Sequence, residues 1–176
     1  LEIIEIIGRN HTNQNEIIQI VQKEKTPLIN LDLVQIRSDI INIGWIEDAI
    51  VLRKLPKKIV IKIKEHIPIA LLQTKQGHQL INKHGKIINE KNISNFSHLP
   101  VVSGKNASSK VFHILNVLKT EPEIFSDVWA IQFISERRWD IYLKSGITIK
   151  LPEKEPVFAW TKFAKLEREN SITKRD

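Results

Sequence analysis

Hydrophobic positions near the start of the chain change from strand-like to helical spacing. Residues 1–7 are mostly β-branched and apolar and stop at Gly8, a pattern typical of a strand followed by a turn. Apolar residues then recur at helical spacing from Glu16, and Pro27 prevents a longer helix. Thr12 is the expected N-cap of this first helix.

A second helical pattern follows Asp32, which is a good N-cap, and ends shortly before Trp45. Residues 49–53 are strand-like, and after a turn at residues 55–58 an alternating run at residues 59–63 predicts a hairpin with one wet face. The order strand, helix, helix, strand, strand predicts a small α+β unit whose helices cover one side of a sheet. We expect Trp45 to anchor the helix to the hairpin.

Short strands dominate the pattern in the rest of the chain. We expect strands at residues 80–81, 87–88, 99–102, 128–134, 139–143 and 147–151. Helices are expected at residues 108–118, with Ser108 or Ser109 as N-cap, and at residues 158–166. Trp129 and Trp160 are both expected in the core. The second half is therefore predicted to be rich in sheet.

Composition narrows the class of protein without fixing it. The 176 residues carry a formal net charge of +7, which suits an anionic partner such as nucleic acid, a lipid surface or an acidic protein, although scattered lysines also serve solubility. The chain contains no cysteine, which excludes disulfides and cysteine-based zinc sites.

The sequence also bears on where the natural protein begins. It contains no methionine and begins at Leu1, so we expect the natural N-terminus to lie upstream. Within the chain, no apolar run is long enough for a membrane span.

Patterns that carry catalysis or bind a metal do not occur. The histidines show neither paired helical spacing nor a zincin arrangement, no serine lies in a nucleophile motif, and the glycines form no phosphate loop. Glu136 and Asp140 flank Arg137, Arg138 and Trp139, but such a mixture at the start of a strand is typical of solvated ion pairs. We predict a protein that is not an enzyme and binds no metal or cofactor.

Ordered motifs along nearly the whole chain resemble one bacterial family. The run from Gly44 to Pro56, with residues 59–63 and 65–70 after it, resembles the POTRA domain of the cell-division family FtsQ, called DivIB in other bacteria. The likeness continues through residues 80–85, Leu99-Pro100 with Gly104, and residues 138–152, which are similar to the family's second, β domain. Departures from the family pattern are Gly44, Leu55, His66 and Asn82.

The resemblance implies an α+β fold with two domains. A POTRA domain of order β-α-α-β-β would occupy residues 1–70, and a mainly antiparallel β domain with flanking helices would occupy residues 71–176. That β domain normally continues into further strands, so we expect it to be truncated here at its C-terminal end. The residues expected to shape these folds are Trp45, Arg53, Pro56, Glu65, Pro68, Gly85, Pro100, Gly104, Gly146 and Leu151.

The resemblance also implies a function in septum formation. The chain would be the periplasmic part of a single-pass inner-membrane protein, a non-catalytic divisome scaffold at the division septum. It would bind FtsB and FtsL and link them to the septal cell-wall synthesis machinery, with no nucleic acid or small-molecule substrate. A free sheet edge could accept a partner strand, and Arg137, Arg138 and Trp139 are the candidate partner-binding residues, although a solvated strand start explains them equally well.

Two other functions remain open on the sequence. A POTRA-type chaperone for outer-membrane proteins would have further POTRA copies upstream or a barrel of alternating strands downstream. A basic nucleic-acid-binding domain would bind with a steep dependence on salt, and Lys57-Lys58 or Arg137-Arg138-Trp139 could contact the nucleic acid. Only 6% of the residues are aromatic, which leaves few rings for base stacking.

Overall fold

The computed structural model describes residues 3–170, and the chain divides between Ile67 and Pro68 into two units. The boundary that the sequence suggested, after residue 70, falls inside strand β4 (Pro68–Thr74). In that strand Pro68 aligns with Asn82 and Ala70 with Ile81, so residues 68–70 belong to the sheet of the second unit.

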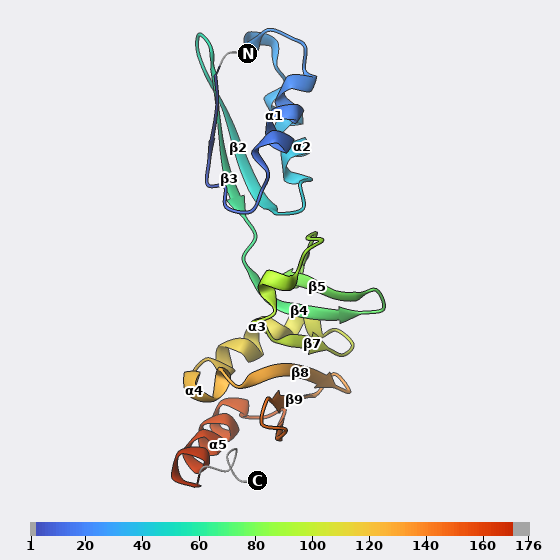
Figure 1. Ribbon diagram of the computed structural model, residues 1–176, viewed down its shortest axis with the longest axis vertical. Helices are drawn as coiled ribbons and strands as arrows, with labels where there is room; N and C mark the ends of the chain where they lie inside the picture. The colour runs from blue at the N-terminus through green and yellow to red at the C-terminus, as the bar shows by residue number, and fades with distance from the viewer. Residues whose placement is uncertain (1–2, 171–176) are drawn as a thin grey trace. The chain divides into compact units, whose positions relative to one another are not determined.

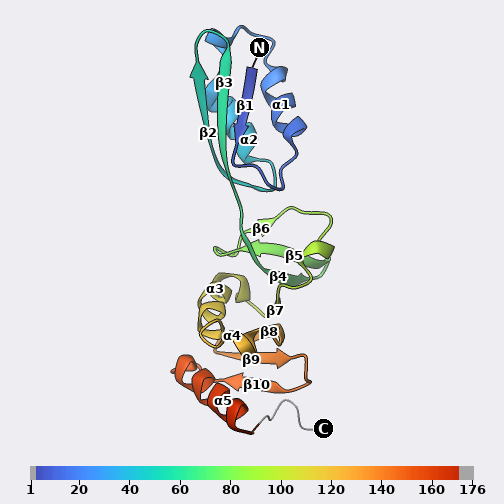
Figure 2. The same cartoon turned by 60° about the vertical axis from the view of Figure 1, so that its left-hand side comes forward.

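The first unit is a three-stranded sheet covered on one face by two helices (Figures 1 and 2). Its elements are β1 (Ile3–Ile7), α1 (Gln14–Lys23), a 3-10 turn (Leu28–Asn30), α2 (Leu33–Ile41), β2 (Ile46–Lys54) and β3 (Lys58–Glu65). Strand β3 is central, parallel to β1 and antiparallel to β2. The predicted order β-α-α-β-β is confirmed.

The helical and alternating patterns meet in the core of this unit. Ile17 of α1 and Ile36 of α2 are fully or almost fully buried against Ile61 of the central strand. Burying a side chain of this size stabilises the fold by roughly 1.5–3 kcal/mol. The alternation placed Val60 on the wet face, but this residue is only 2% exposed. It lies in the central strand, where Leu52 of β2 and Glu5 of β1 are its neighbours on the two sides.

Helix capping follows the sequence prediction at one helix and departs from it at two. Asp32 caps α2, accepting hydrogen bonds from the N–H groups of Val34 and Gln35. Thr12 is not the cap of α1, since Asn13 accepts the N–H of Asn15 there and Thr12 is buried. The prediction for the third helix was also wrong: Ser108 and Ser109 lie inside its first turn, which no side chain caps.

The second unit is a seven-stranded sheet in the order β10-β9-β8-β7-β4-β5-β6. After β4 its strands are β5 (Gly77–Asn82), β6 (Ile87–Ile88), β7 (Val101–Ser103), β8 (Val128–Ile134), β9 (Arg138–Leu143) and β10 (Thr148–Leu151). Its helices are α3 (Ala107–Leu118), α4 (Pro122–Phe125) and α5 (Pro156–Asn170), with a 3-10 turn at Ser94–Phe96. All neighbouring pairs are antiparallel except β4 with β7 and β7 with β8. A mainly antiparallel β domain with flanking helices is confirmed.

Trp160 fastens α5 to the core of the second unit. Its side chain is fully buried, and its indole N–H donates to the carbonyl of Leu118 at the end of α3, 3.0 Å away. Buried Trp normally needs such a partner, because an unpaired indole N–H is costly to bury. The predicted core position of Trp160 is confirmed.

Trp129 was wrongly predicted to lie in the core. A shift of register between Val128 and Ala130 breaks the alternation of β8, and the Trp129 side chain is 51% exposed. Its ring lies beside that of Tyr142, with centroids 6.2 Å apart. Tyr142 alternates with the buried Ile141 of β9, so both rings lie on the sheet face opposite the helices.

The close approach at Gly104 yields a stability prediction. Gly104 has φ of +113°, and a Cβ there would lie 2.3 Å from the carbonyl oxygen of Phe133, whereas Gly146 has φ of +88° with nothing within 4 Å. We expect Gly146→Ala to cost about 1–2 kcal/mol from its left-handed backbone alone. Gly104→Ala should cost distinctly more, because the backbone of β8 must also move. Urea denaturation of both variants checks this, and equal losses would contradict it.

Candidate partner-binding edge

Strand β10 is the outermost strand on one side of the seven-stranded sheet. The N–H of Leu143 donates to the carbonyl of Ile147 at 2.9 Å, which fixes the alternation of the β9–β10 ladder. Ile149 therefore bonds to β9, whereas Thr148 and Lys150 direct their N–H and C=O groups away from β9. Within residues 3–170 no strand pairs with this outer side. The β10 edge can thus accept another strand through main-chain hydrogen bonds.

Arg137 and Arg138 lie beside one end of the β10 edge. With Ile134, Ser135, Pro152 and Glu153 they line a shallow hollow of ≈ 310 Å³. The Arg137 Nε is 3.7 Å from a carboxylate oxygen of Glu153, and both side chains are well exposed. Such a loose pair contributes little to stability, so the Arg137 guanidinium can exchange Glu153 for a carboxylate of a partner at small cost.

The second arginine is held more tightly than the first. The Nε of Arg138 donates to Oδ1 of Asp140 at 3.0 Å, and the Asp140 side chain is only 8% exposed. This carboxylate needs its cation, because a buried charge without a partner is costly. Arg138 therefore has a structural task, which leaves Arg137 as the better candidate for contact with a partner.

The ring of Trp139 is not part of the exposed surface. The residue is 8% exposed, and its ring stacks on Phe133 with centroids 4.6 Å apart. The structure thus gathers Arg137 and Arg138 at one surface and places the Trp139 ring beneath it. Trp139 would therefore act on a partner only indirectly, by holding β9 in position.

The turn between β8 and β9 holds Arg137 in place. Ser135 and Glu136 have φ of +51° and +55°, which costs roughly 1–2 kcal/mol for each residue other than glycine. Glu136 offsets part of this cost by accepting from the Lys105 ammonium at 2.6 Å and the Asn106 amide at 2.8 Å. The Lys105 hydrogen bond, then that of Asn106, lowers the pKa of the Glu136 carboxyl. Glu136 and Asp140, which flank the arginines in the sequence, belong to separate ion pairs.

In the first unit, Glu65 ties the loop after β1 to the end of β3. Its carboxylate accepts the N–H groups of His11 at 2.9 and 3.0 Å and of Thr12 at 2.8 Å. Burial alone would raise the pKa of Glu65, but the hydrogen bonds from Thr12 and His11 outweigh burial and lower that pKa below its usual 4.5.

The ring of Trp45, which is 5% exposed, stacks on the ring of His11 with centroids 4.2 Å apart. Trp45 is therefore buried as expected, with the loop after β1 as a packing partner.

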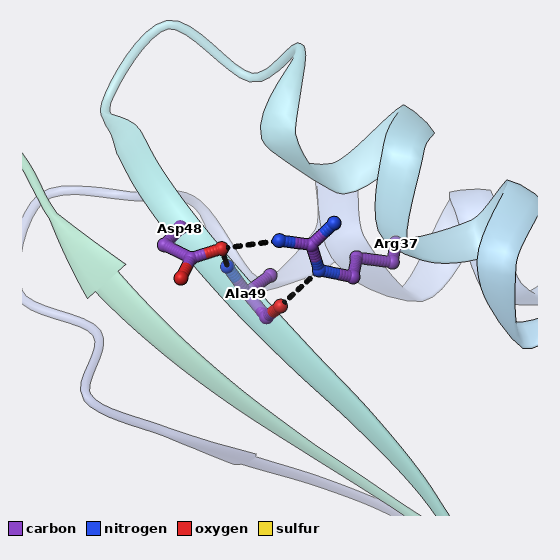
Figure 3. Close-up of polar contacts among 3 residues, drawn as sticks. All are labelled: Arg37, Asp48 and Ala49. Atoms are coloured by element: carbon purple, nitrogen blue, oxygen red, sulfur yellow. Dashed lines mark hydrogen bonds and ion pairs between the residues drawn. The ribbon is translucent and has the colours of Figure 1, made fainter.

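Arginines of the first unit fasten its helices to β2. Arg37 of α2 donates from Nε to the Ala49 carbonyl and from Nη2 to Asp48, each at 2.7 Å (Figure 3). The N–H of Ala49, followed by Arg37, lowers the pKa of Asp48. Arg53 donates to the Leu31 carbonyl at 2.8 Å. The family resemblance singled out Arg53, whereas Arg37 lies outside the motifs that carry the resemblance and was missed.

The other motif residues shape strands and turns. A Cβ at Gly85 would lie 2.5 Å from the Ser108 carbonyl oxygen, and the Pro100 carbonyl accepts the N–H of Leu71 at 3.0 Å. Pro68 begins β4, and Leu151 is buried at the end of β10. Pro56 lies in the tip of the β2–β3 hairpin. None of these side chains lines the hollow beside Arg137.

A second hollow, which sequence reasoning missed, lies on the open face of the seven-stranded sheet. It has a volume of ≈ 280 Å³ and is lined by Gln73, His78, Val101, Ser103, Trp129, Ala130 and Tyr142. The register shift in β8 is what brings Trp129 to this face. A bulge of this kind depends on the pairing of two strands, so a single sequence gives little warning of it.

Two other kinds of site are absent from the part of the chain that the structure describes. None of its helices combines the length and the apolar character that crossing a bilayer requires. Among residues 3–170, His, Asp and Glu side chains also form no cluster of three that could hold a metal ion.

Comparison with known proteins gives two family matches in series. The family model described as "POTRA domain, FtsQ-type" matches residues 1–66, and the one described as "Cell division protein FtsQ/DivIB, C-terminal" matches residues 70–175. Together they account for nearly the whole chain.

Curated relatives agree with the family matches. The chain is 30% identical over 177 residues to cell division protein FtsQ of Agrobacterium fabrum, covering 100% of this chain and 56% of the relative. It is 32% identical to FtsQ of Zymomonas mobilis, covering 98% and 55%, and 35% identical to FtsQ of Rickettsia bellii, covering 88% and 58%. The chain thus spans a little more than half the length of these relatives.

A solved structure also overlaps with part of the chain. It is the major extracytoplasmic domain of the trans isomer of the cell division protein DivIB from Geobacillus stearothermophilus. The match covers 61% of this chain and 96% of that one, with a TM-score of 0.43 and 14% identity. This overlap is low, so the family assignment depends on the family models and the relatives.

The Glu65 hydrogen bonds predict a stability that depends on pH. Because the folded-state pKa of Glu65 lies below its ordinary value of 4.5, its contribution is complete above that value and is lost as the pH falls through the folded pKa. We expect Glu65→Gln to lower the free energy of unfolding by about 1–2 kcal/mol at neutral pH. Urea denaturation should show this difference shrinking in acid. A difference that stayed constant with pH would contradict the assignment.

The two arginines should differ in their effect on stability. Arg137→Ala should change the free energy of unfolding by less than about 0.5 kcal/mol, since its pair with Glu153 is exposed. Arg138→Ala should lower it by about 1–3 kcal/mol, because the buried carboxylate of Asp140 loses its donor. Thermal or urea unfolding of the two variants measures this. Equal effects would show that Arg138 is not structurally distinct from Arg137.

Proposed function

The chain belongs to the FtsQ/DivIB family of cell division proteins, and from this we propose that it acts as a non-catalytic scaffold of the divisome. In this proposal it binds FtsB and FtsL and links them to septal cell-wall synthesis. A partner strand joins the seven-stranded sheet on the β10 side, where the described residues leave the edge open. The observation that carries the proposal is the outward-facing main-chain groups of Thr148 and Lys150, next to the exposed guanidinium of Arg137.

Strand addition would give both affinity and register. Each outward N–H and C=O of β10 gains a main-chain partner in the complex, and these groups alternate with residues that bond to β9. Along β10, Thr148 and Lys150 are exposed, while Ile149 and Leu151 pack toward the helix-covered core. A partner strand with apolar side chains at every second position would extend that core beyond Ile149.

Charge would orient the partner strand along the edge. Arg137 lies at the end where β10 finishes, and Lys150 is exposed within the strand. A carboxylate on the partner that replaces Glu153 as the counterion of Arg137 would fix one end of the strand. Exposed pairs of this kind add more to selectivity and rate of association than to affinity.

The same family assignment supports a proposal for the localisation of the chain. We propose that the two units are the periplasmic part of a protein anchored in the inner membrane by one span upstream of Leu1, concentrated at the division septum. A chaperone of outer-membrane proteins remains the alternative from the same structural class. Reading the residues upstream and downstream in the gene product separates the two, since the alternative requires more POTRA copies or a barrel.

The decisive variant is Lys150→Pro, which removes an outward N–H and leaves the β9 ladder intact. In titrations of the full extracytoplasmic region with the periplasmic segment of FtsB, we expect the dissociation constant to rise at least about tenfold, from a lost main-chain hydrogen bond and the bulk of the ring. The matched control Lys150→Ala keeps the N–H and should bind nearly as the parent protein does.

Arg137→Glu tests the charge contribution separately. It should weaken binding and reduce the dependence of the association rate on salt, because a repulsive pair replaces an attractive one. Thermal unfolding of each variant verifies that the fold is intact. If folded Lys150→Pro bound FtsB as tightly as the parent protein, the proposed edge would be wrong.

A further inference from the structure

Three segments of the first unit meet at one end of its sheet (Figures 1 and 2): the start of β1, the tip of the β2–β3 hairpin and the 3-10 turn Leu28–Asn30. The N–H of Ile3 donates to the Lys57 carbonyl at 3.3 Å, which joins β1 to the hairpin. Arg53 donates to the Leu31 carbonyl, which joins the 3-10 turn to the end of β2. We call these segments the entry end, because any chain that precedes Ile3 reaches the unit there.

Each segment of the entry end exposes one large aliphatic side chain. Leu55 in the hairpin tip is 67% exposed, Ile29 in the 3-10 turn is 63% exposed, and Ile3 at the start of β1 is 53% exposed. An isolated exposed apolar residue is ordinary on a protein surface. Here three of them protrude from separate segments at one end, which the folding of the unit alone does not require.

Lysines surround these apolar tips. Lys54, Lys57 and Lys58 flank Leu55 in the hairpin, and Lys58 pairs with Glu5. Among the described residues, the acidic side chains next to the 3-10 turn are occupied or balanced: Asp32 caps α2, and Glu24 is followed directly by Lys25. The entry end is therefore a cationic surface with aliphatic tips.

We propose that the entry end contacts an anionic lipid bilayer. Leu55, Ile29 and Ile3 insert among the acyl chains near the headgroups, and the lysines contact headgroup phosphates while their stems lie along the apolar boundary. Separate tips suit a fluid interface, which imposes no fixed shape. A specific protein partner would instead need a continuous contact of roughly 800 Å² on this side.

The contact would determine how the first unit sits on the membrane. The proposed bilayer contact rests on the proposed function in one respect. An anchoring span upstream, which belongs to that function, would hold the entry end at the bilayer. The bilayer contact itself involves no residue of the β10 edge. Loss of lipid binding and loss of FtsB binding can therefore be measured independently.

Vesicle flotation of residues 1–176 tests the contact. We expect the chain to float with vesicles containing phosphatidylglycerol and to float much less with pure phosphatidylcholine. The double variant Lys54→Ser, Lys57→Ser should lower the partition coefficient roughly tenfold or more. The matched control Lys75→Ser, Lys91→Ser removes the same charge from exposed positions of the second unit and should change it little.

A fluorescent probe tests insertion of the hairpin tip. Because the chain has no cysteine, Leu55→Cys gives a single labelling site, and Lys91→Cys gives a control on the second unit. An environment-sensitive dye at position 55 should shift to the blue with anionic vesicles, and the same dye at position 91 should not. The variant Leu55→Ser, Ile29→Ser should bind vesicles less well while binding FtsB as the parent protein does.

Three outcomes would overturn the proposal. They are failure of the parent chain to float with anionic vesicles, an equal loss in the two lysine variants, and an unshifted dye at position 55. An equal loss would mean that the overall positive charge, and not the entry end, attracts the chain to lipid.

Discussion

A strand at the border of a sheet leaves every second residue with an N–H and a C=O that its neighbour cannot satisfy, and the proposed partner surface depends on this constraint. In β10 those residues are Thr148 and Lys150. Water can satisfy such groups, but another strand does so with fixed direction and spacing. Among residues 3–170 no strand uses these groups, so the seven-stranded sheet can be extended on this side. The position of Arg137, the burial of Trp139 and the constrained turn before β9 all help to hold this strand edge and the cation beside it in place.

The rest of the second unit keeps this border in register. Trp160 joins α5 to α3 beneath the sheet, and Gly104 lets the chain pass close to the backbone of β8. Glu136 pins the β8–β9 turn to Lys105 and Asn106, before the start of α3. Asp140 holds Arg138 in place, which leaves Arg137 as the arginine free to change partners at low cost. Stability and recognition are thereby divided between two adjacent residues.

Much of the fold was predictable because its signals are local. The alternating isoleucines of β3, the Asp32 cap and the turn at Gly146 each depend on a few neighbouring residues, and all appear where the pattern placed them. The exposure of Trp129 was not predictable, since it arises from a register shift set by pairing with β9. Likewise, nothing in the sequence tells Arg137 from Arg138. That difference depends on the burial of Asp140, which only the packed sheet determines.

Amide hydrogen exchange of the full extracytoplasmic region, with and without bound FtsB, tests whether β10 receives the partner strand. We expect the amides of Thr148 and Lys150 to be protected in the complex, because both point into the partner side of β10. Free exchange at these two amides in the complex, with new protection appearing at β2 or β6 instead, would contradict the proposed edge.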